Sequence, residues 1–449
     1  MAHRAVDPLE NRLRTERDPA RAFSVLDLDD THGRERLQRF SHRRAAHAEA
    51  GHEISLGGQV SAGIDFAALN DLKELVEDFV GELAALDAFG GGGRRLTHWY
   101  DEYTMAPMRI LRFAMIGSGF WARYQLAGWL EAGGAHCVGV YNRTRAKAEA
   151  LARDFGALPV FDDVEAILRD TQPDFADVVT DVGTHARYTK LAAAAGIPVV
   201  CQKPLAASYG EAAEMLAACR SAGVPLYVNE NWRWQTPIRE LKRSLASVDI
   251  GDIFRARIRM VSGFRLFENQ PFLRELEQFV LTDMGSHVLD VARFLFGEAE
   301  SLYCQTFQAH KDIRGEDVAT VILKMKTGAT VTVEMGYAEN YLERDRFPET
   351  SIFVEATRGS AELELDHWVR ITTEGGTHIR RCPPPHYAWA DARYDVVHSS
   401  IVPCQANLLA AMRGECAAET SGEDNLKTVR LVFAAYESAA TGQRVRVSS

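Results

Sequence analysis

ILRFAMIGSGFWA, residues 110–122, joins a nearly continuous apolar run to a glycine turn. The apolar run is typical of a strand that is buried on both faces of a parallel sheet. The turn has the Gly-x-Gly-x-x-Ala spacing that separates a strand from a helix in dinucleotide-binding folds, where the glycines permit a tight turn and a close approach of the backbone to a pyrophosphate. A glycine turn in an α/β protein without a nucleotide is the simpler alternative. Five residues of the turn are predicted to bind a dinucleotide: Gly117, Gly119, Phe120, Trp121 and Ala122.

Strands and helices alternate from this turn up to about residue 234. Further apolar runs predict strands at 137–141, 158–161, 177–180 and 198–201, with helical segments between them. Strands that alternate with helices of this length indicate a doubly wound parallel sheet of the Rossmann type. We assign this α/β domain to residues 108–234.

The pattern changes after Trp234. Between Ala319 and Met335, apolar and polar residues alternate on both sides of the turn Lys326-Thr327-Gly328. Such a hairpin belongs to a largely antiparallel sheet with one covered face. We therefore predict an α+β domain with a large, mainly antiparallel sheet over residues 235–449.

The sequence pattern of residues 1–107 differs from that of the two domains, and we interpret these residues as an N-terminal extension. A stripe of apolar residues at helical spacing predicts a helix over about 65–89, and the run of glycines at 90–93 ends it. The helix either packs on its own chain or serves as a docking or oligomerisation helix.

Composition limits the classes of function. The chain has 449 residues, of which 46% are hydrophobic, as expected for a globular protein with sizeable cores. Its net charge of −11 argues against nucleic acid as a partner. The seven cysteines form no C-x-x-C pair, which argues against a disulfide framework or a structural zinc site and favours the cytoplasm. No apolar stretch is long enough to predict a membrane span, and the N-terminal residues lack the apolar segment of a secretory signal.

The residues after the second strand bear on the choice between NAD and NADP. An NAD enzyme usually has an acidic residue there, which binds the ribose hydroxyls. This chain has Asn142 and Arg143 instead. Arg143 could pair with the 2′-phosphate of NADP, so both residues are predicted to contact the cofactor, with NADP slightly favoured.

Two further segments carry residues suited to proton transfer. Lys203 follows a predicted strand at the carboxyl edge of the sheet, where it could bind a substrate hydroxyl near a nicotinamide. Asp283 and His287 are four residues apart, so on one helix they would share a face, and the carboxylate could fix the tautomer of the imidazole. The simpler interpretations are a solvated lysine, a capping aspartate and a core histidine. A zinc site at Asp283 and His287 is disfavoured because further ligands at helical spacing are missing, so no metal is predicted.

Taken together, residues 109–440 resemble the Gfo/Idh/MocA family of oxidoreductases. The resemblance implies that Lys203, Asp283 and His287 are the catalytic residues, because they occupy the family's E-K-P and D-x-x-x-H segments. It also implies cofactor contacts for the segment that matches T-P-x-x-x-H and for the residues around Lys203. These residues are Thr180, His185, Gln202 and Arg233.

Two residues depart from the family pattern. Gln202 replaces the usual glutamate beside Lys203, and Asp181 replaces the usual proline. The resemblance implies hydride transfer between a nicotinamide and a secondary alcohol of a sugar, sugar derivative or cyclitol, in a homodimer or homotetramer. A glycosidase that uses bound NAD transiently and a non-catalytic NAD(P)-sensing regulator are the alternatives. Candidate substrate-lining residues are Trp232, Arg233, Phe264, Arg265, Asn269 and His386.

Overall fold

The computed structural model describes residues 109–447, and the side chain of Asn269 lies outside the description. By its contacts the chain divides into two units, Met1–Thr104 and Met105–Ser449, and the described residues belong to the second unit. The helix predicted over about 65–89 lies outside the described residues.

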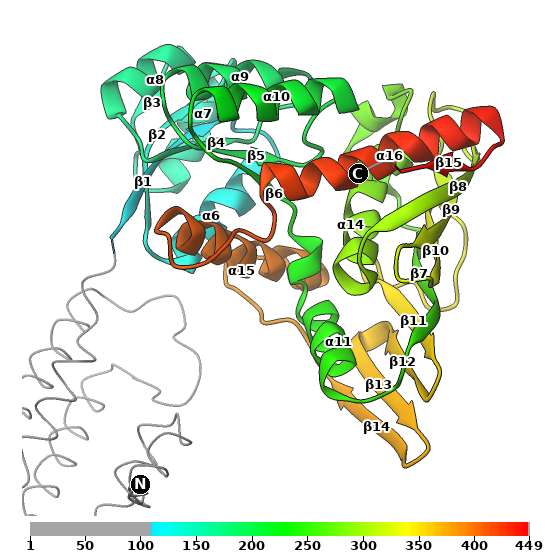
Figure 1. The fold of residues 1–449 in the computed structure, drawn as a ribbon. Helices are drawn as coiled ribbons and strands as arrows, with labels where there is room; N and C mark the ends of the chain where they lie inside the picture. Colours follow the sequence, from blue (N-terminus) through cyan, green and yellow to red (C-terminus); the bar gives the residue numbers. More distant parts are fainter. Residues whose placement is uncertain (1–108, 448–449) are drawn as a thin grey trace, which may run out of the picture. The chain divides into compact units, whose positions relative to one another are not determined.

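The first sheet has six strands in the order β3-β2-β1-β4-β5-β6, all parallel (Figure 1). This confirms the predicted Rossmann architecture. Its strands are β1 (Leu111–Ile116), β2 (Ala135–Tyr141), β3 (Val160–Phe161), β4 (Phe175–Val178), β5 (Val199–Gln202) and β6 (Leu226–Asn229). The helices between them are α6 (Ala122–Ala132), α7 (Arg145–Asp154), α8 (Val164–Thr171), α9 (Val182–Ala194) and α10 (Tyr209–Ser221).

The apolar run of β1 is buried on both faces, as its sequence predicts. Phe113 stacks on Phe175 and lies 5.8 Å from Trp129 of α6, measured between ring centroids. Ala114 and Ile116 belong to the core on the opposite face of the sheet. Because β1 is the central strand, its carboxyl end, and with it the glycine turn, lies in the middle of the sheet edge.

The second sheet has nine strands in the order β14-β13-β12-β11-β7-β10-β9-β8-β15. The sheet is mixed, because β7 and β10 pair in parallel and all other neighbouring strands in it pair in antiparallel. The predicted hairpin is confirmed as β9 and β10. The strands are β7 (Ile253–Ser262), β8 (Ala299–Phe307), β9 (Val318–Met325), β10 (Thr330–Tyr337), β11 (Ser351–Ala356), β12 (Gly359–Glu364), β13 (Trp368–Thr373), β14 (Gly376–Arg381) and β15 (Val445–Arg446).

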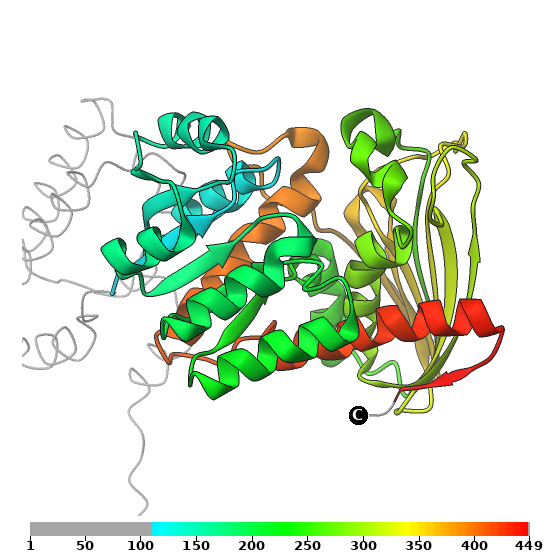
Figure 2. The same ribbon diagram turned by 90° about the horizontal axis from the view of Figure 1, so that it is seen from above.

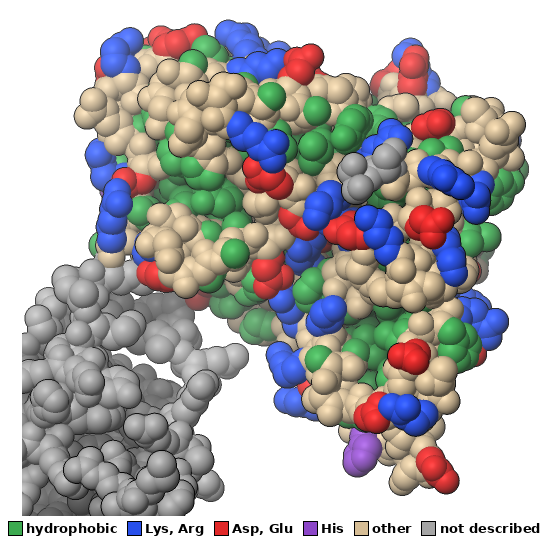
Figure 3. All heavy atoms as spheres, viewed as in Figure 1, with side chains coloured by type: hydrophobic (Ala, Val, Ile, Leu, Met, Phe, Trp, Pro, Cys, Tyr) green, Lys and Arg blue, Asp and Glu red, His purple; other side chains and the backbone are tan. Residues whose placement is uncertain are grey.

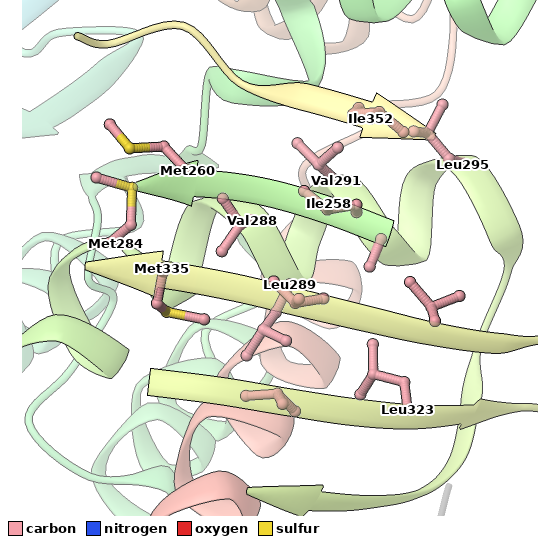
Figure 4. Close-up of a cluster of buried hydrophobic side chains, with 14 of the residues drawn as sticks. Ile258, Met260, Met284, Val288, Leu289, Val291, Leu295, Leu323, Met335 and Ile352 are labelled. Carbon is pink, nitrogen blue, oxygen red and sulfur yellow. The ribbon is translucent and has the colours of Figure 1, made fainter. Parts of the chain in front are cut away.

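One face of this sheet is covered by α14 (Gly285–Phe296). Figure 4 shows Val288, Leu289 and Val291 of this helix packed against side chains of the strands, among them Ile258 and Met335. Every residue of α14 except Phe294 is buried, so the polar residues on this helix need partners inside the protein.

Two late helices of the chain return to the first sheet. α15 (Asp395–Met412) packs against α6 on the first sheet, although its sequence lies within the predicted second domain. α16 (Gly422–Thr441) contacts α10 and β6 at one end and β8 further along, as Figures 1 and 2 show. α16 thus links the first sheet to the second, whereas α15 covers α6 on the first sheet.

On the face shown in Figure 3, acidic and basic side chains of the described residues are interspersed. No helix among residues 109–447 is long and apolar enough to cross a membrane.

Candidate active site

The glycine turn lies between β1 and α6 and has the geometry that a dinucleotide needs. Gly117 has a φ of +117°, and a Cβ there would lie 2.6 Å from the carbonyl oxygen of Val179. No atom lies within 4 Å of the Cβ position of Gly119, so the space beside that residue is open to a ligand. The hydroxyl of Ser118 is buried without a hydrogen-bond partner among the described residues. The turn therefore fits a bound pyrophosphate.

At the predicted ribose end, Asn142 and Arg143 differ in their contacts. The Asn142 side chain accepts a hydrogen bond from the Ser118 N–H (3.1 Å) and donates one to the Thr144 carbonyl (3.0 Å). It therefore braces the glycine turn. Arg143 is exposed, and within residues 109–447 its guanidinium forms no ion pair. Arg143 is thus available to a ligand.

Lys203 and Asp283 come from different parts of the chain and meet directly. Lys203 follows β5, and Asp283 ends α13 (Val280–Asp283). The lysine Nζ donates to the Asp283 carboxylate (3.0 Å) and to its carbonyl oxygen (3.2 Å). Burial raises the pKa of Asp283, but the Lys203 ammonium outweighs this and holds the pKa below its usual value. Both side chains remain partly exposed.

The interpretation of Asp283 and His287 as a pair on one helix is wrong. α13 ends at Asp283 and α14 starts at Gly285, so the two residues belong to different helices. The carboxylate that contacts His287 is Glu230, whose Oε1 lies 2.6 Å from the imidazole Nδ1. A carboxylate does contact the imidazole and can orient it, but this carboxylate belongs to Glu230 and not to Asp283.

Glu230 and His287 form a buried pair. The ring of Trp232 stacks on the imidazole with centroids 4.6 Å apart and an angle of 11°. Burial, and then the nearby Lys203 charge, hold the pKa of His287 well below its usual value. Burial raises the pKa of Glu230 to about 7, although Lys203 acts in the opposite direction. The second oxygen of Glu230, Oε2, has no partner among the described residues.

Sequence reasoning missed Glu230 even though it follows directly on β6. The available signal was an acidic residue between an apolar strand and the aromatic Trp232-Arg233-Trp234, at the same sheet edge as Lys203. A carboxylate at the carboxyl end of a buried strand is a candidate for site chemistry.

Gln202 uses both ends of its amide inside the protein. Its Oε1 accepts from the backbone N–H of Lys203 (2.7 Å), and its Nε2 donates to Gln125 (2.6 Å). Gln125 donates in turn to Asp177 (2.5 Å), whose other oxygen accepts from Trp129 (2.8 Å). This geometry favours a role in positioning Lys203 over the predicted cofactor contact.

The Arg233 guanidinium is likewise hydrogen-bonded to other groups of the protein. It is buried, and it donates to Asp290 (2.7 Å), Asp424 (2.8 Å) and the Glu419 carbonyl (2.8 Å). These contacts tie α14 to α16 behind the site. They favour a supporting role for Arg233 over the cofactor contact that the resemblance implied.

Thr180 and His185 lie beside the turn that follows β4. The imidazole of His185 contacts the Thr180 carbonyl through Nε2 (3.1 Å) and the Pro204 carbonyl through Nδ1 (3.1 Å). The histidine therefore bridges the loop after β4 and the loop that carries Lys203. Both loops lie at the sheet edge where the glycine turn is found.

The predicted lining residues have different contacts. Trp232 lies at the site, against His287. Phe264 stacks on Phe347 (4.2 Å), Arg265 pairs with Glu268, and His386 contacts Asp395 (3.0 Å). Among residues 109–447, no group of three or more His, Cys, Asp or Glu side chains is arranged to hold a metal ion.

Two family models match the chain. The model described as an oxidoreductase family with an NAD-binding Rossmann fold, Gfo/Idh/MocA, matches residues 111–230, and a Gfo/Idh/MocA C-terminal domain matches residues 238–362. A D-apiose dehydrogenase of Paraburkholderia graminis is 37% identical over 346 residues, which cover 77% of this chain and 92% of the relative. A D-apiose dehydrogenase of Rhizobium rhizogenes is also 37% identical, over 76% of this chain and 99% of the relative.

Solved structures agree with this assignment. An oxidoreductase from Agrobacterium radiobacter, in complex with NAD+, L-tartaric acid and magnesium, matches with a TM-score of 0.73 and 37% identity, over 75% of this chain and 98% of that structure. A levoglucosan dehydrogenase in complex with NADH and levoglucosan matches with a TM-score of 0.66 at 20% identity, over 76% of this chain and all of that structure, and shows the shared fold.

Proposed function

The chain belongs to the Gfo/Idh/MocA oxidoreductase family, and on that premise we propose that it is an NAD(P)-dependent dehydrogenase that oxidises a CH–OH group of a sugar or a related polyol. Two pairs of side chains carry the proposal: the Lys203–Asp283 ion pair and the Glu230–His287 pair. Both lie at the sheet edge where the glycine turn is found. The names of the relatives support a small sugar as the substrate class.

His287 is the proposed proton acceptor. Because burial keeps the imidazole neutral at pH 7, one ring nitrogen must be free of a proton. An ionised Glu230 accepts from Nδ1–H, which leaves Nε2 to take the proton from the substrate hydroxyl. Within residues 109–447 no group hydrogen-bonds to Nε2. Glu230 then stabilises the imidazolium that forms.

Lys203 is proposed to bind the oxygen that loses this proton. Asp283 holds the ammonium in place by accepting two of its hydrogens, one at the carboxylate and one at the carbonyl, and the third N–H can donate to the substrate oxygen. A bound nicotinamide supplies the hydride acceptor for the carbon that carries the hydroxyl. As the O–H proton passes to His287 and the hydride leaves the carbon, the C–O single bond becomes a carbonyl.

We propose that the adenosine end accepts NADP as well as NAD. Arg143 supports this, because it is exposed and forms no ion pair with the residues that the structure describes, and a guanidinium can bind a 2′-phosphate in two-point contact. Arg143→Ala should weaken binding of NADP and leave binding of NAD unchanged, which titration of cofactor fluorescence would measure. Equal effects on both cofactors would contradict this part of the proposal.

We further propose that the open face of the nine-stranded sheet is covered by a second copy of the chain. Three apolar side chains lie in one row across this face and are partly exposed: Ile322 (43%), Phe353 (39%) and Ile379 (50%). Thr332, Arg257, Glu362 and Arg370 separate them in this row, so the face presents apolar and charged groups together, a mixture that suits an interface between two copies. Phe353→Asp should convert the oligomer to monomers in light scattering. An unchanged mass, or a monomeric parent protein, would contradict it.

A cytoplasmic location remains part of the proposal. All seven cysteines are free thiols, and six of them are buried. Unpaired cysteines are typical of proteins in reducing compartments.

The test is turnover with a panel of D-apiose, D-xylose, D-glucose and myo-inositol, in the presence of NAD or NADP. We expect one of these compounds to reduce the cofactor, and Lys203→Ala or His287→Ala to abolish the reaction. Lys190→Ala is the matched control, because that lysine is on the surface and pairs with Glu214. Full activity in the Lys203 and His287 variants would overturn the site assignment. Free sugar released from a glycoside added to the panel, without reduced cofactor, would favour a glycosidase, and cofactor binding without any turnover would favour a regulator.

A further inference from the structure

His398 lies in the first turn of α15, against the residues that open the dinucleotide helix. Its ring stacks on Tyr124 with centroids 4.2 Å apart and an angle of 22°, and Trp121 lies 6.0 Å away. Trp121 belongs to the glycine turn, and Tyr124 is on the first turn of α6. One side of His398 therefore faces the end of the site where the cofactor is expected.

The same turn of α15 is bonded to the segment that carries Glu230. Asn231 donates from Nδ2 to the Val397 carbonyl (3.1 Å) and to the Ser400 hydroxyl (2.7 Å). Asn231 directly follows Glu230, and His398 directly follows Val397. His398 is thus fixed close to the Glu230–His287 pair.

A series of aromatic rings continues from His398 toward Asp283. Tyr394 lies 5.9 Å from His398, and Phe347 lies 5.9 Å from Tyr394. Phe347 also lies 5.9 Å from Tyr337, whose pKa is raised by burial and then by the nearby charge of Asp283. The rings thus connect the surroundings of His398 to Tyr337, a residue close to Asp283.

The tautomer of His398 follows from its backbone contact. Nδ1 accepts a hydrogen bond from the Asp391 N–H (3.2 Å), so Nδ1 carries no proton. Burial lowers the pKa of His398 to about 4, so the ring is neutral at pH 7 and its hydrogen is on Nε2. Within residues 109–447 this Nε2–H has no hydrogen-bond partner. It is a fixed, uncharged donor that the protein does not use.

We propose that His398, with the partly exposed rings of Trp121, Tyr124 and Tyr394, forms a sugar-binding subsite in which Nε2–H donates to a substrate hydroxyl. The aromatic rings offer apolar faces to the C–H groups of the sugar. A neutral donor among aromatic rings suits an uncharged monosaccharide, since a phosphate or carboxylate would favour a cationic partner. This subsite deepens the proposed function, on which it rests, by assigning the residue that holds the sugar beside His287.

The experiment compares two substitutions of the same residue. His398→Phe keeps a ring that can stack on Tyr124 but removes the donor, and His398→Gln keeps a donor close to the position of Nε2. Sugar affinity is measured by calorimetry on the NAD-loaded full-length protein with D-apiose, D-xylose, D-glucose and myo-inositol, and turnover is measured with the same panel. His136→Gln is the matched control, because His136 is exposed at the amino end of β2, away from the sheet edge that carries the site.

We expect His398→Phe to raise the dissociation constant and KM of the sugar by about tenfold, as loss of one hydrogen bond predicts, with NAD affinity unchanged. His398→Gln should recover part of that loss, and His136→Gln should have no effect. Sugar affinity equal to the parent protein in His398→Phe would overturn the subsite, and so would a parent protein that binds none of the four compounds. If the parent protein binds a sugar through His398 but reduces no cofactor, the subsite is supported and the dehydrogenase proposal fails.

Discussion

Replacing Glu230 by glutamine tests the proton-transfer pair with little change in shape. Glutamine keeps the size of the side chain and an oxygen that can accept from the His287 Nδ1–H, but it removes the negative charge. The 2.6 Å contact puts the centres of the two charges roughly 4 Å apart, and at an effective dielectric of about 20 their attraction is about 4 kcal/mol. At about 1.4 kcal/mol per factor of ten, loss of this attraction when the imidazolium forms should lower kcat by ~10³-fold.

The pH profile separates this effect from a general loss of structure. Because burial raises the pKa of Glu230 to about 7, the carboxylate is present above that pH and protonated below it, so kcat of the parent protein should rise with pH through about 7. Glu230→Gln should lose this rise, and its NAD affinity should stay unchanged. The assay is steady-state cofactor reduction between pH 5.5 and pH 9, with Glu419→Gln as a control, since that carboxylate pairs with Arg239 outside the site. A Glu230→Gln variant with the parent kcat and the parent pH profile would refute the reasoning.

Four other substitutions test the turn and the buried charges. Gly117→Ala should lower the melting temperature and abolish NAD binding, because Gly117 has a positive φ and lies close to a backbone carbonyl. Gly119→Ala should lower NAD affinity alone. Unchanged NAD affinity in the Gly119→Ala variant would contradict the open phosphate site. Burial raises the pKa of Asp177 to about 7, so its contribution to stability is full below pH 4 and is lost as the pH rises through 7. Between pH 4 and about pH 7, the unfolding free energy of Asp177→Asn in urea should therefore fall less than that of the parent protein. An equal fall in both proteins would argue against the raised pKa of Asp177. Arg233→Met leaves Asp290 buried without its main partner and should cost about 3–5 kcal/mol of unfolding free energy, and a cost well below 1 kcal/mol would show that the pair is not structural.

Much of the fold can be predicted from the sequence, because the local apolar patterns match the strands that the two sheets contain. The apolar run before Gly117 predicts the central strand, and the alternation around Lys326-Thr327-Gly328 predicts the hairpin of β9 and β10. What the patterns do not contain is the return of α15 to the first sheet. That contact joins segments about 280 residues apart, as in the hydrogen bond from Gln405 to Gln125, and no local periodicity encodes it.

The site was predicted in part, for a related reason. Lys203 and Asp283 were proposed separately, and the structure brings them into one ion pair. Their spacing could not reveal that Met284 separates two helices, and so the partner of His287 was assigned to the wrong carboxylate. Glu230 is 57 residues away from His287, and only the crossing of α14 over the end of β6 brings the two together.

The most direct test of the dehydrogenase account is isotope transfer. The substrate identified in the panel is prepared with deuterium on the carbon that is oxidised, and the nucleotide is analysed by mass spectrometry after one turnover. The account predicts reduced nicotinamide that carries the deuterium from the parent protein and none from His287→Ala. Product formed with unlabelled, oxidised nucleotide would contradict it.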